Sequence, residues 1–208
     1  FMSLGKLERA IESFNSALSH ANRIGRTTTI SRILDNLAKA YQIKGDFDKA
    51  LELNKQAMDM DPTGAKPVYH RARLLYMKRE MTHAEALLTD ALRSSDNPQY
   101  HFARALINAY HGKRDLAELE IEEGFKGIAS GSVEFFGKTE CYLDAIEVFY
   151  NAKQYDRCRF YATQALSFLP FDSRERLIVD AVLHMCDYLT DSSKFLNIDT
   201  NLNSLMEM

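Results

Sequence analysis

The sequence is poor in the residues that mark several large classes of protein. It contains no tryptophan, and only nine glycines and four prolines among 208 residues, with no Gly-X-Y period. A collagen-like or low-complexity chain is therefore excluded. Its three cysteines, Cys141, Cys158 and Cys186, are an odd number and too far apart for a disulfide framework or a CxxC metal site. We expect them to be small buried side chains in a reducing compartment.

Two further absences concern membranes and nucleic acids. No apolar run approaches the roughly 20 residues that cross a bilayer, and the first six residues lack the apolar stretch of a signal peptide. The 26 Lys and Arg residues against 29 Asp and Glu residues give a net charge of -3, without the basic field typical of nucleic-acid-binding domains. We therefore predict a cytoplasmic protein that binds neither a membrane nor, directly, a nucleic acid.

A repeated pattern of small residues is present instead. Pairs of small residues seven positions apart occur as Ala10 and Ala17, Ala50 and Ala57, Ala84 and Ala91, and Cys158 and Ala165. The steps between successive pairs are 40, 34 and 74 residues, and 74 is 34 plus 40. One unit therefore recurs, sometimes with six extra residues, which is the signature of a repeat protein.

Each unit is predicted to form two helices. The apolar stripe of the first helix in residues 31–44 has the i, i+3, i+4, i+7 spacing and comprises Leu34, Leu37, Ala38 and Tyr41. Gly45 ends this helix, and a second stripe begins at Phe47 and stops before Pro62, which cannot continue a helix. The small residues allow the two helices to approach closely, because large side chains there would overpack the crossing.

This pattern resembles the tetratricopeptide repeat family, whose 34-residue unit is a pair of helices with small residues at fixed positions. Residues 31–64 match the unit best, with Gly45, Ala50, Ala57 and Pro62 in family positions. Units 65–98 and 139–172 match less completely. Residues 100–131 match through Leu106, Ile107 and Tyr110, and residues from 1 to about 24 supply only the second helix of a unit.

The resemblance implies an all-α fold, an α-solenoid of stacked helix-turn-helix repeats that forms a right-handed superhelix. We expect a single array over residues 1–189, with an irregular link at residues 127–137 and a C-terminal capping helix over about 173–189. Residues 190–208 are predicted to be a polar C-terminal tail. Because the sequence given begins within a unit, we expect the natural protein to extend upstream.

No pattern of catalytic residues is found. The six histidines include no HExxH motif, and the sequence has no P-loop, no GxGxxG that opens a helix and no GxSxG elbow. We therefore predict a protein that is not an enzyme and has no metal site and no cofactor. The carboxylates at positions 118, 120, 122 and 123 are interpreted as a solvated helix face.

In tetratricopeptide arrays, the first helices of successive repeats line a concave groove that holds a peptide or a partner helix. The resemblance places this groove at unit positions 2, 5, 6, 9, 12 and 13, which are enriched in Lys and Arg in the second to fourth repeats and in acidic residues in the repeat at 139–172. The candidate partner-binding residues are Arg32, Lys39, Lys66, Tyr69, Arg73, Tyr76, Arg104, Asn108 and Glu147.

The sequence thus favours a protein- or peptide-binding module whose partner carries an acidic segment. An alternative is a peptide-sensing or regulatory domain of a larger protein, such as a bacterial transcription regulator whose DNA-binding domain lies outside this sequence. Homodimerisation through the unpaired first helix is a further alternative. We also expect charge reversal of Lys39, Arg73 and Arg104 together to abolish partner binding without changing the melting temperature.

Overall fold

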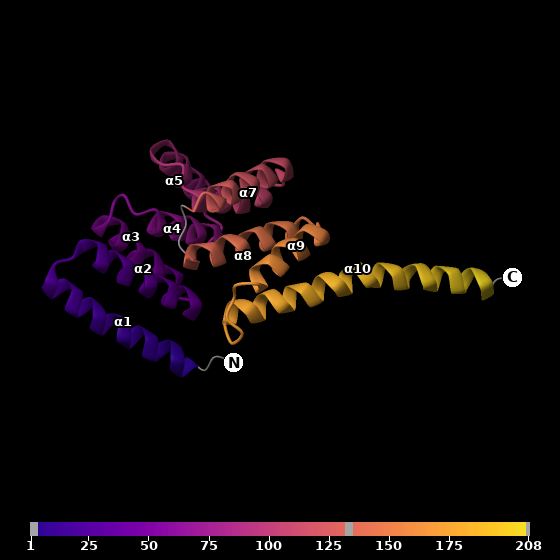
Figure 1. Cartoon of the computed structure of the whole chain (residues 1–208), viewed down its shortest axis with the longest axis horizontal. Coiled ribbons are helices and arrows are strands. Elements are labelled where there is room, and N and C mark those ends of the chain that lie inside the picture. Colours follow the sequence, from indigo (N-terminus) through magenta and orange to yellow (C-terminus); the bar gives the residue numbers. More distant parts are fainter. Residues whose placement is uncertain (1–3, 132–134, 207–208) are drawn as a thin grey trace.

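The computed structural model describes residues 4–131 and 135–206, and within these ranges it contains ten helices and no strand. The helices are α1 (Leu4–Ile24), α2 (Thr27–Lys44), α3 (Phe47–Met60), α4 (Ala65–Met77), α5 (Met81–Ser94), α6 (Pro98–Tyr110), α7 (Arg114–Ala129), α8 (Phe135–Asn151), α9 (Tyr155–Leu166) and α10 (Arg174–Met206). Figure 1 shows them in a curved array that leads from α1 to the long α10. The predicted all-α repeat architecture is confirmed.

The helices pack in the pairs that the repeats predict. Within the units, α2 packs on α3, α4 on α5, α6 on α7 and α8 on α9. At the two ends of the described array, α1 packs on α2 and α10 packs on α9. The first helices also contact one another in sequence, α2 with α4, α4 with α6 and α6 with α8, so they form one continuous wall.

Small side chains lie at the helix crossings, as the repeat pattern predicts. Ala50, Ala57, Ala84 and Cys158 are all fully buried. A larger side chain at any of these positions would have to push two packed helices apart.

The cysteines are buried side chains with free thiols, as expected from their spacing. Among the residues that the structure describes, no group of three His, Cys, Asp or Glu side chains is arranged to hold a metal ion. In the same part of the chain, no helix has both the length and the apolar character that a membrane span requires.

The helix ends follow local sequence signals. Gly45 has the left-handed φ of 89° that glycine adopts without steric conflict, and it ends α2. The side chain of Asp46 then caps α3 by accepting a hydrogen bond from the backbone N–H of Lys49 at 3.1 Å. Ser173 caps α10 in the same way, through the N–H of Arg176 at 3.1 Å.

The repeat predicted at residues 100–131 begins two residues earlier than expected. Gly112 has a positive φ of 72°, and the buried Ala117 and Gly124 lie at the two helix crossings. Counted from Pro98, these residues fall at unit positions 15, 20 and 27, which are the positions of the turn glycine and the two small residues. The fourth unit therefore starts at Pro98.

The error has a physical cause, because glycine replaces alanine at the second crossing of this unit. A Cβ atom on Gly124 would lie 2.5 Å from Cε2 of Phe102, so only glycine fits there without displacement. The predicted register placed Leu119 and Lys126 at the crossings, and the structure leaves both side chains exposed.

Two predicted boundaries also differ from the structure. Because α7 continues to Ala129 and α8 begins at Phe135, most of the link predicted at 127–137 is helical, and residues 132–134 lie outside the described residues. Helix α10 continues to Met206 and includes most of the predicted tail at 190–208, of which residues 207 and 208 are not described. No glycine or proline follows Arg174 in the sequence, so nothing in the chain interrupts this helix.

Candidate functional site

The first helices of the complete units, α2, α4, α6 and α8, form one wall, and the predicted partner-binding residues lie on these helices. Side chains of α2 and α4 contact side chains of α8, although the partners are 70 to 101 residues apart in sequence. The basic part of the predicted groove and its acidic part therefore face each other within one molecule.

A buried ion pair joins α4 to α8. The Nε of Arg73 lies 3.0 Å from Oδ1 of Asp144, and the hydroxyl of Tyr69 donates a hydrogen bond to Oδ2 of the same carboxylate at 2.5 Å. Both Tyr69 and Asp144 are fully buried. Further along the two helices, the hydroxyl of Tyr76 donates to Oε1 of Glu147 at 3.0 Å. These contacts hold α8 against α4.

Burial changes the acidity of the groups in this contact. It raises the pKa of Asp144 to about 6, although Arg73 and the Tyr69 hydroxyl act in the opposite direction. Burial and the charge of Glu147 also raise the pKa of Tyr76, so this phenol stays protonated and continues to donate. The nearby charge of Arg73 and the hydrogen bond from Tyr69 thus favour the charged form of a carboxylate that burial disfavours.

A second polar cluster joins α2, α4 and α8. The Nδ1 of His70 lies 2.7 Å from the Asp35 carboxylate, Nε2 lies 3.0 Å from Oε2 of Glu140, and Lys39 pairs with the other oxygen of Glu140. Burial favours the neutral ring and lowers the pKa of His70 to about 4, although hydrogen bonding to Asp35 opposes this. Burial, followed by the nearby charge of Lys66, lowers the pKa of Lys39 to about 8.

A cavity of about 500 Å³, which we call the groove cavity, lies between these helices and the start of α10. Its volume is within the range of about 300–1,000 Å³ typical of ligand pockets. The apolar residues that line it are Ile43, Leu143, Leu169, Pro170 and Ile178. The polar residues are Lys39, Gln42, His70, Arg73, Thr139, Glu140, Ser173, Arg174 and Glu175.

The structure brings several of the predicted partner-binding residues to this region. Lys39 and Arg73 line the groove cavity itself. Tyr69, Tyr76 and Glu147 form the internal contacts between α4 and α8 described above. Arg32 lies near the start of α2 and is exposed. Lys66 lies near the start of α4 and is half-buried.

Two predicted residues lie elsewhere. The Nη2 of Arg104 lies 2.6 Å from Oε1 of Glu120, and Nδ1 of His101 lies 2.7 Å from Oε2, so this face of α6 contacts α7 of the same unit. Asn108, four residues after Arg104, is buried. Their predicted groove positions are therefore wrong, because a two-residue shift turns a helix by about 200°. Glu120 is buried as well, and does not belong to a solvated face.

The contribution of α10 was not predicted from the sequence. Arg174 and Ile178 line the groove cavity, and Sδ of Met185 lies 3.9 Å from the hydroxyl of Tyr150 on α8. A signal was available, since counting a further unit from Ser173 places Ile178 and Met185 at groove positions 6 and 13.

The internal ion pairs also change the expected result of charge reversal. A glutamate at position 73 would face the buried carboxylate of Asp144, and a glutamate at position 39 would face Glu140. We therefore expect the combined reversal of Lys39, Arg73 and Arg104 to lower the melting temperature, so this variant cannot separate binding from folding.

Comparisons with known proteins agree with the repeat architecture. Two models described as tetratricopeptide repeat match the chain, one over residues 1–63 and the other over residues 41–107. A comparison with curated protein sequences gives no match.

Two solved structures have a similar fold. The chain is similar to TTC0263, a thermophilic TPR protein in Thermus thermophilus, with a TM-score of 0.54 and 18% identity over 83% of this chain and 98% of that chain. It is also similar to BtubC (BKLC) from P. vanneervenii, with a TM-score of 0.56 and 19% identity over 94% of this chain and 92% of that chain. The family models, the helix pairs and the small residues at their crossings agree, and the chain belongs to the tetratricopeptide repeat family.

Proposed function

We propose that the chain is a non-catalytic binding module that holds a peptide or protein segment in the groove cavity. Proteins with this fold are generally non-enzymatic protein-interaction scaffolds. The observation that carries the proposal is the cavity of about 500 Å³ between α2, α4, α8 and the start of α10, which combines apolar walls with charged groups.

The lining of the cavity suits a segment with an aliphatic side chain next to an acidic group. Ile43, Leu143 and Ile178 provide an apolar surface for the aliphatic side chain. Arg174 is exposed and forms no ion pair with any side chain that the structure describes, so it is available to a carboxylate. An incoming carboxylate would compete with Glu140 for Lys39.

The exposed apolar face of α10 extends this surface. Ile178, Ala181, Met185 and Tyr188 follow a spacing of three and four residues and therefore share one helix face. Ile178 is 42% exposed, Met185 49% and Tyr188 73%. Large apolar side chains gathered on one exposed face mark interaction sites more often than scattered ones do. A bound segment would therefore continue from the cavity along α10.

The remaining predicted residues receive two different roles in this proposal. Tyr69, Tyr76 and Glu147 hold α8 in place and so shape the cavity without touching the partner. Arg32 and Lys66, at the starts of α2 and α4, attract the acidic part of the partner.

The proposal is tested by selecting ligands from a displayed random-peptide library and measuring their affinity for two variants. We expect the selected peptides to contain aliphatic and acidic residues, and Ile178→Asp to weaken their binding because it places a carboxylate at the cavity wall. Leu116→Asp is the matched control, since Leu116 is 49% exposed on α7, away from the groove. Equal binding to both variants, or no selected peptide, would contradict the proposal.

The narrower roles remain predictions. These are the sensing or regulatory domain of a larger regulator, homodimerisation through α1, and a cytoplasmic location.

A further inference from the structure

A second surface lies where the first helix of each unit turns into the second helix. We call residues 77–80, 110–114 and 151–154 the turn edge. They contain the α4–α5, α6–α7 and α8–α9 turns. The guanidinium of Arg79 lies 5.0 Å from the centre of the Tyr110 ring, which places the first two turns side by side. Residues of the second and third turns line one common pocket. The turn edge is thus continuous, and none of its residues lines the groove cavity.

The backbone of the turn edge is unusual at one repeated position. The residue at unit position 15 has a positive φ in every complete unit. Two units have a glycine there, Gly45 and Gly112, and the other two have a long cation, Arg79 and Lys153. The φ values of Arg79 and Lys153 are 63° and 59°, which residues other than glycine rarely adopt. Two long cations thus stand where the backbone favours glycine, and side chains held in such conformations are candidates for a functional role.

The cations of the turn edge are available to a partner. The segments contain five Lys or Arg residues and one acidic residue, Glu80, which lies 3.6 Å from Lys78. The other four, Arg79, Lys113, Arg114 and Lys153, are exposed, and none forms an ion pair with a side chain that the structure describes. A basic strip therefore crosses three repeats of a protein whose net charge is -3.

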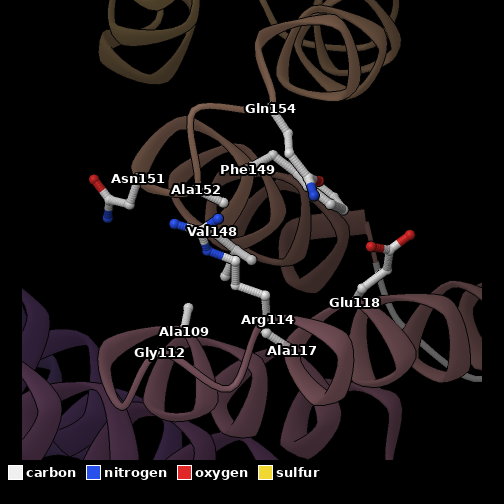
Figure 2. Close-up of a pocket in the computed structure, with 10 residues that line it drawn as sticks. All are labelled: Ala109, Gly112, Arg114, Ala117, Glu118, Val148, Phe149, Asn151, Ala152 and Gln154. Atoms are coloured by element: carbon white, nitrogen blue, oxygen red, sulfur yellow. The ribbon is translucent and has the colours of Figure 1, made fainter.

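Apolar side chains and a pocket accompany this charge. Met77 is 43% exposed and Tyr110 is 49% exposed. The pocket, of about 120 Å³, lies between the α6–α7 and α8–α9 turns. Figure 2 shows the guanidinium of Arg114 extending across it toward Val148 and Ala152.

The acidic residue of the pocket does not offset this cation. Glu118 lies on another side of the pocket in Figure 2, and it is paired with Arg157. The Oε1 of Gln154 is buried there without a hydrogen-bond partner among the described residues. Among the residues that the structure describes, the pocket therefore offers the Arg114 cation beside apolar Val148, Phe149 and Ala152 and the polar Gln154.

We propose that the turn edge binds an acidic protein segment that carries apolar side chains. Its carboxylates would pair with Arg79, Arg114 and Lys153, and its apolar side chains would contact Met77 and Tyr110. This interaction goes beyond the groove cavity and uses none of the residues that line it, so the protein would hold two partner segments at once.

The test uses a fluorescein-labelled peptide composed of Glu and Phe, with a peptide of Lys and Phe for comparison, in anisotropy titrations at low and high salt. We expect the Glu peptide to bind and the Lys peptide not to bind. The double variant Arg79→Gly, Lys153→Gly should bind the Glu peptide at least roughly tenfold more weakly. Its melting temperature should equal or exceed that of the wild type, since glycine adopts positive φ freely. Lost binding without lost stability separates a binding role from a structural one.

Matched control variants show whether the lost affinity is specific to the turn edge. Lys55→Ala, Arg93→Ala removes the same charge from the exposed faces of α3 and α5, and should retain binding. Ile178→Asp should also retain it, because Ile178 lies in the groove cavity. The proposal is overturned if the wild type does not bind the Glu peptide, or if either control loses binding as the double glycine variant does. Binding to vesicles of anionic lipid is measured in parallel. The proposal is also overturned if the double variant loses affinity for these vesicles and keeps its affinity for the Glu peptide.

Discussion

Replacing Arg73 by methionine tests the central contact between α4 and α8. The change leaves the fully buried Asp144 carboxylate without its cation, while the hydrogen bond from the Tyr69 hydroxyl stays in place. Removing one partner of a buried ion pair costs about 3–5 kcal/mol. Because the Arg73 side chain is 22% exposed, water already screens part of the ion pair. We therefore expect the free energy of unfolding to fall by about 3 kcal/mol, the lower end of this range. For a chain of this length, that loss lowers the melting temperature by roughly 6–12 °C.

The pH dependence of this variant has a definite sign. Burial already raises the pKa of Asp144 to about 6, and Arg73 opposes that rise, so the pKa increases further in Arg73→Met. A carboxyl whose pKa is higher in the folded state than in the unfolded state stabilises the fold at low pH. This stability is lost as the pH rises through the folded-state value. The variant should therefore be closest to wild type at about pH 5 and weakest at about pH 8.

Thermal melting followed by circular dichroism at both pH values measures these effects. The double variant Arg73→Met, Asp144→Asn removes both charges and should recover most of the loss, because no uncompensated charge stays buried. The contact does not stabilise the fold as argued if Arg73→Met has the melting temperature of the wild type at pH 8. The same follows if the double variant melts no higher than the single variant.

Two further predictions concern α6 and α7. Gly124→Ala places a Cβ atom 2.5 Å from Cε2 of Phe102 and should destabilise the protein by about 1–3 kcal/mol. Thermal melting measures this loss, and an unchanged melting temperature would count against the start of the fourth unit at Pro98. Hydrogen bonding to Glu120 raises the pKa of His101, so this pair stabilises the fold below the unfolded histidine pKa of about 6.5 and loses that effect as the pH rises through the higher folded value. Glu120→Gln should flatten this dependence of the melting temperature between about pH 5 and 8, and an unaltered profile would show that the pair does not cause it.

The sequence predicted the fold because its signals are local. Alanines seven positions apart mark the helix crossings, and Gly45 and Pro62 end helices through backbone conformations that no distant contact has to impose. The prediction failed in the unit that begins at Pro98. Gly124 replaces the expected alanine at the second crossing of this unit, and only the close approach of Phe102 identifies it as a crossing residue.

The candidate site was predicted in part. The repeat positions placed Lys39, Tyr69, Arg73 and Tyr76 on the inner helices, and the structure finds them there. The same rule misplaced Arg104, because this residue lies in the unit at residues 100–131, whose predicted register was wrong by two residues.

The sequence by itself thus determined that this chain is a stack of helix pairs with opposite charges along its inner helices. Only the tertiary structure decided that these charges meet, with Arg73 on Asp144 and Lys39 on Glu140, and that α10 closes a cavity beside them. The physical reason is that the curvature of a repeat array is the sum of small rotations between neighbouring units. No single unit encodes that sum, so contacts between distant units cannot be read from their patterns.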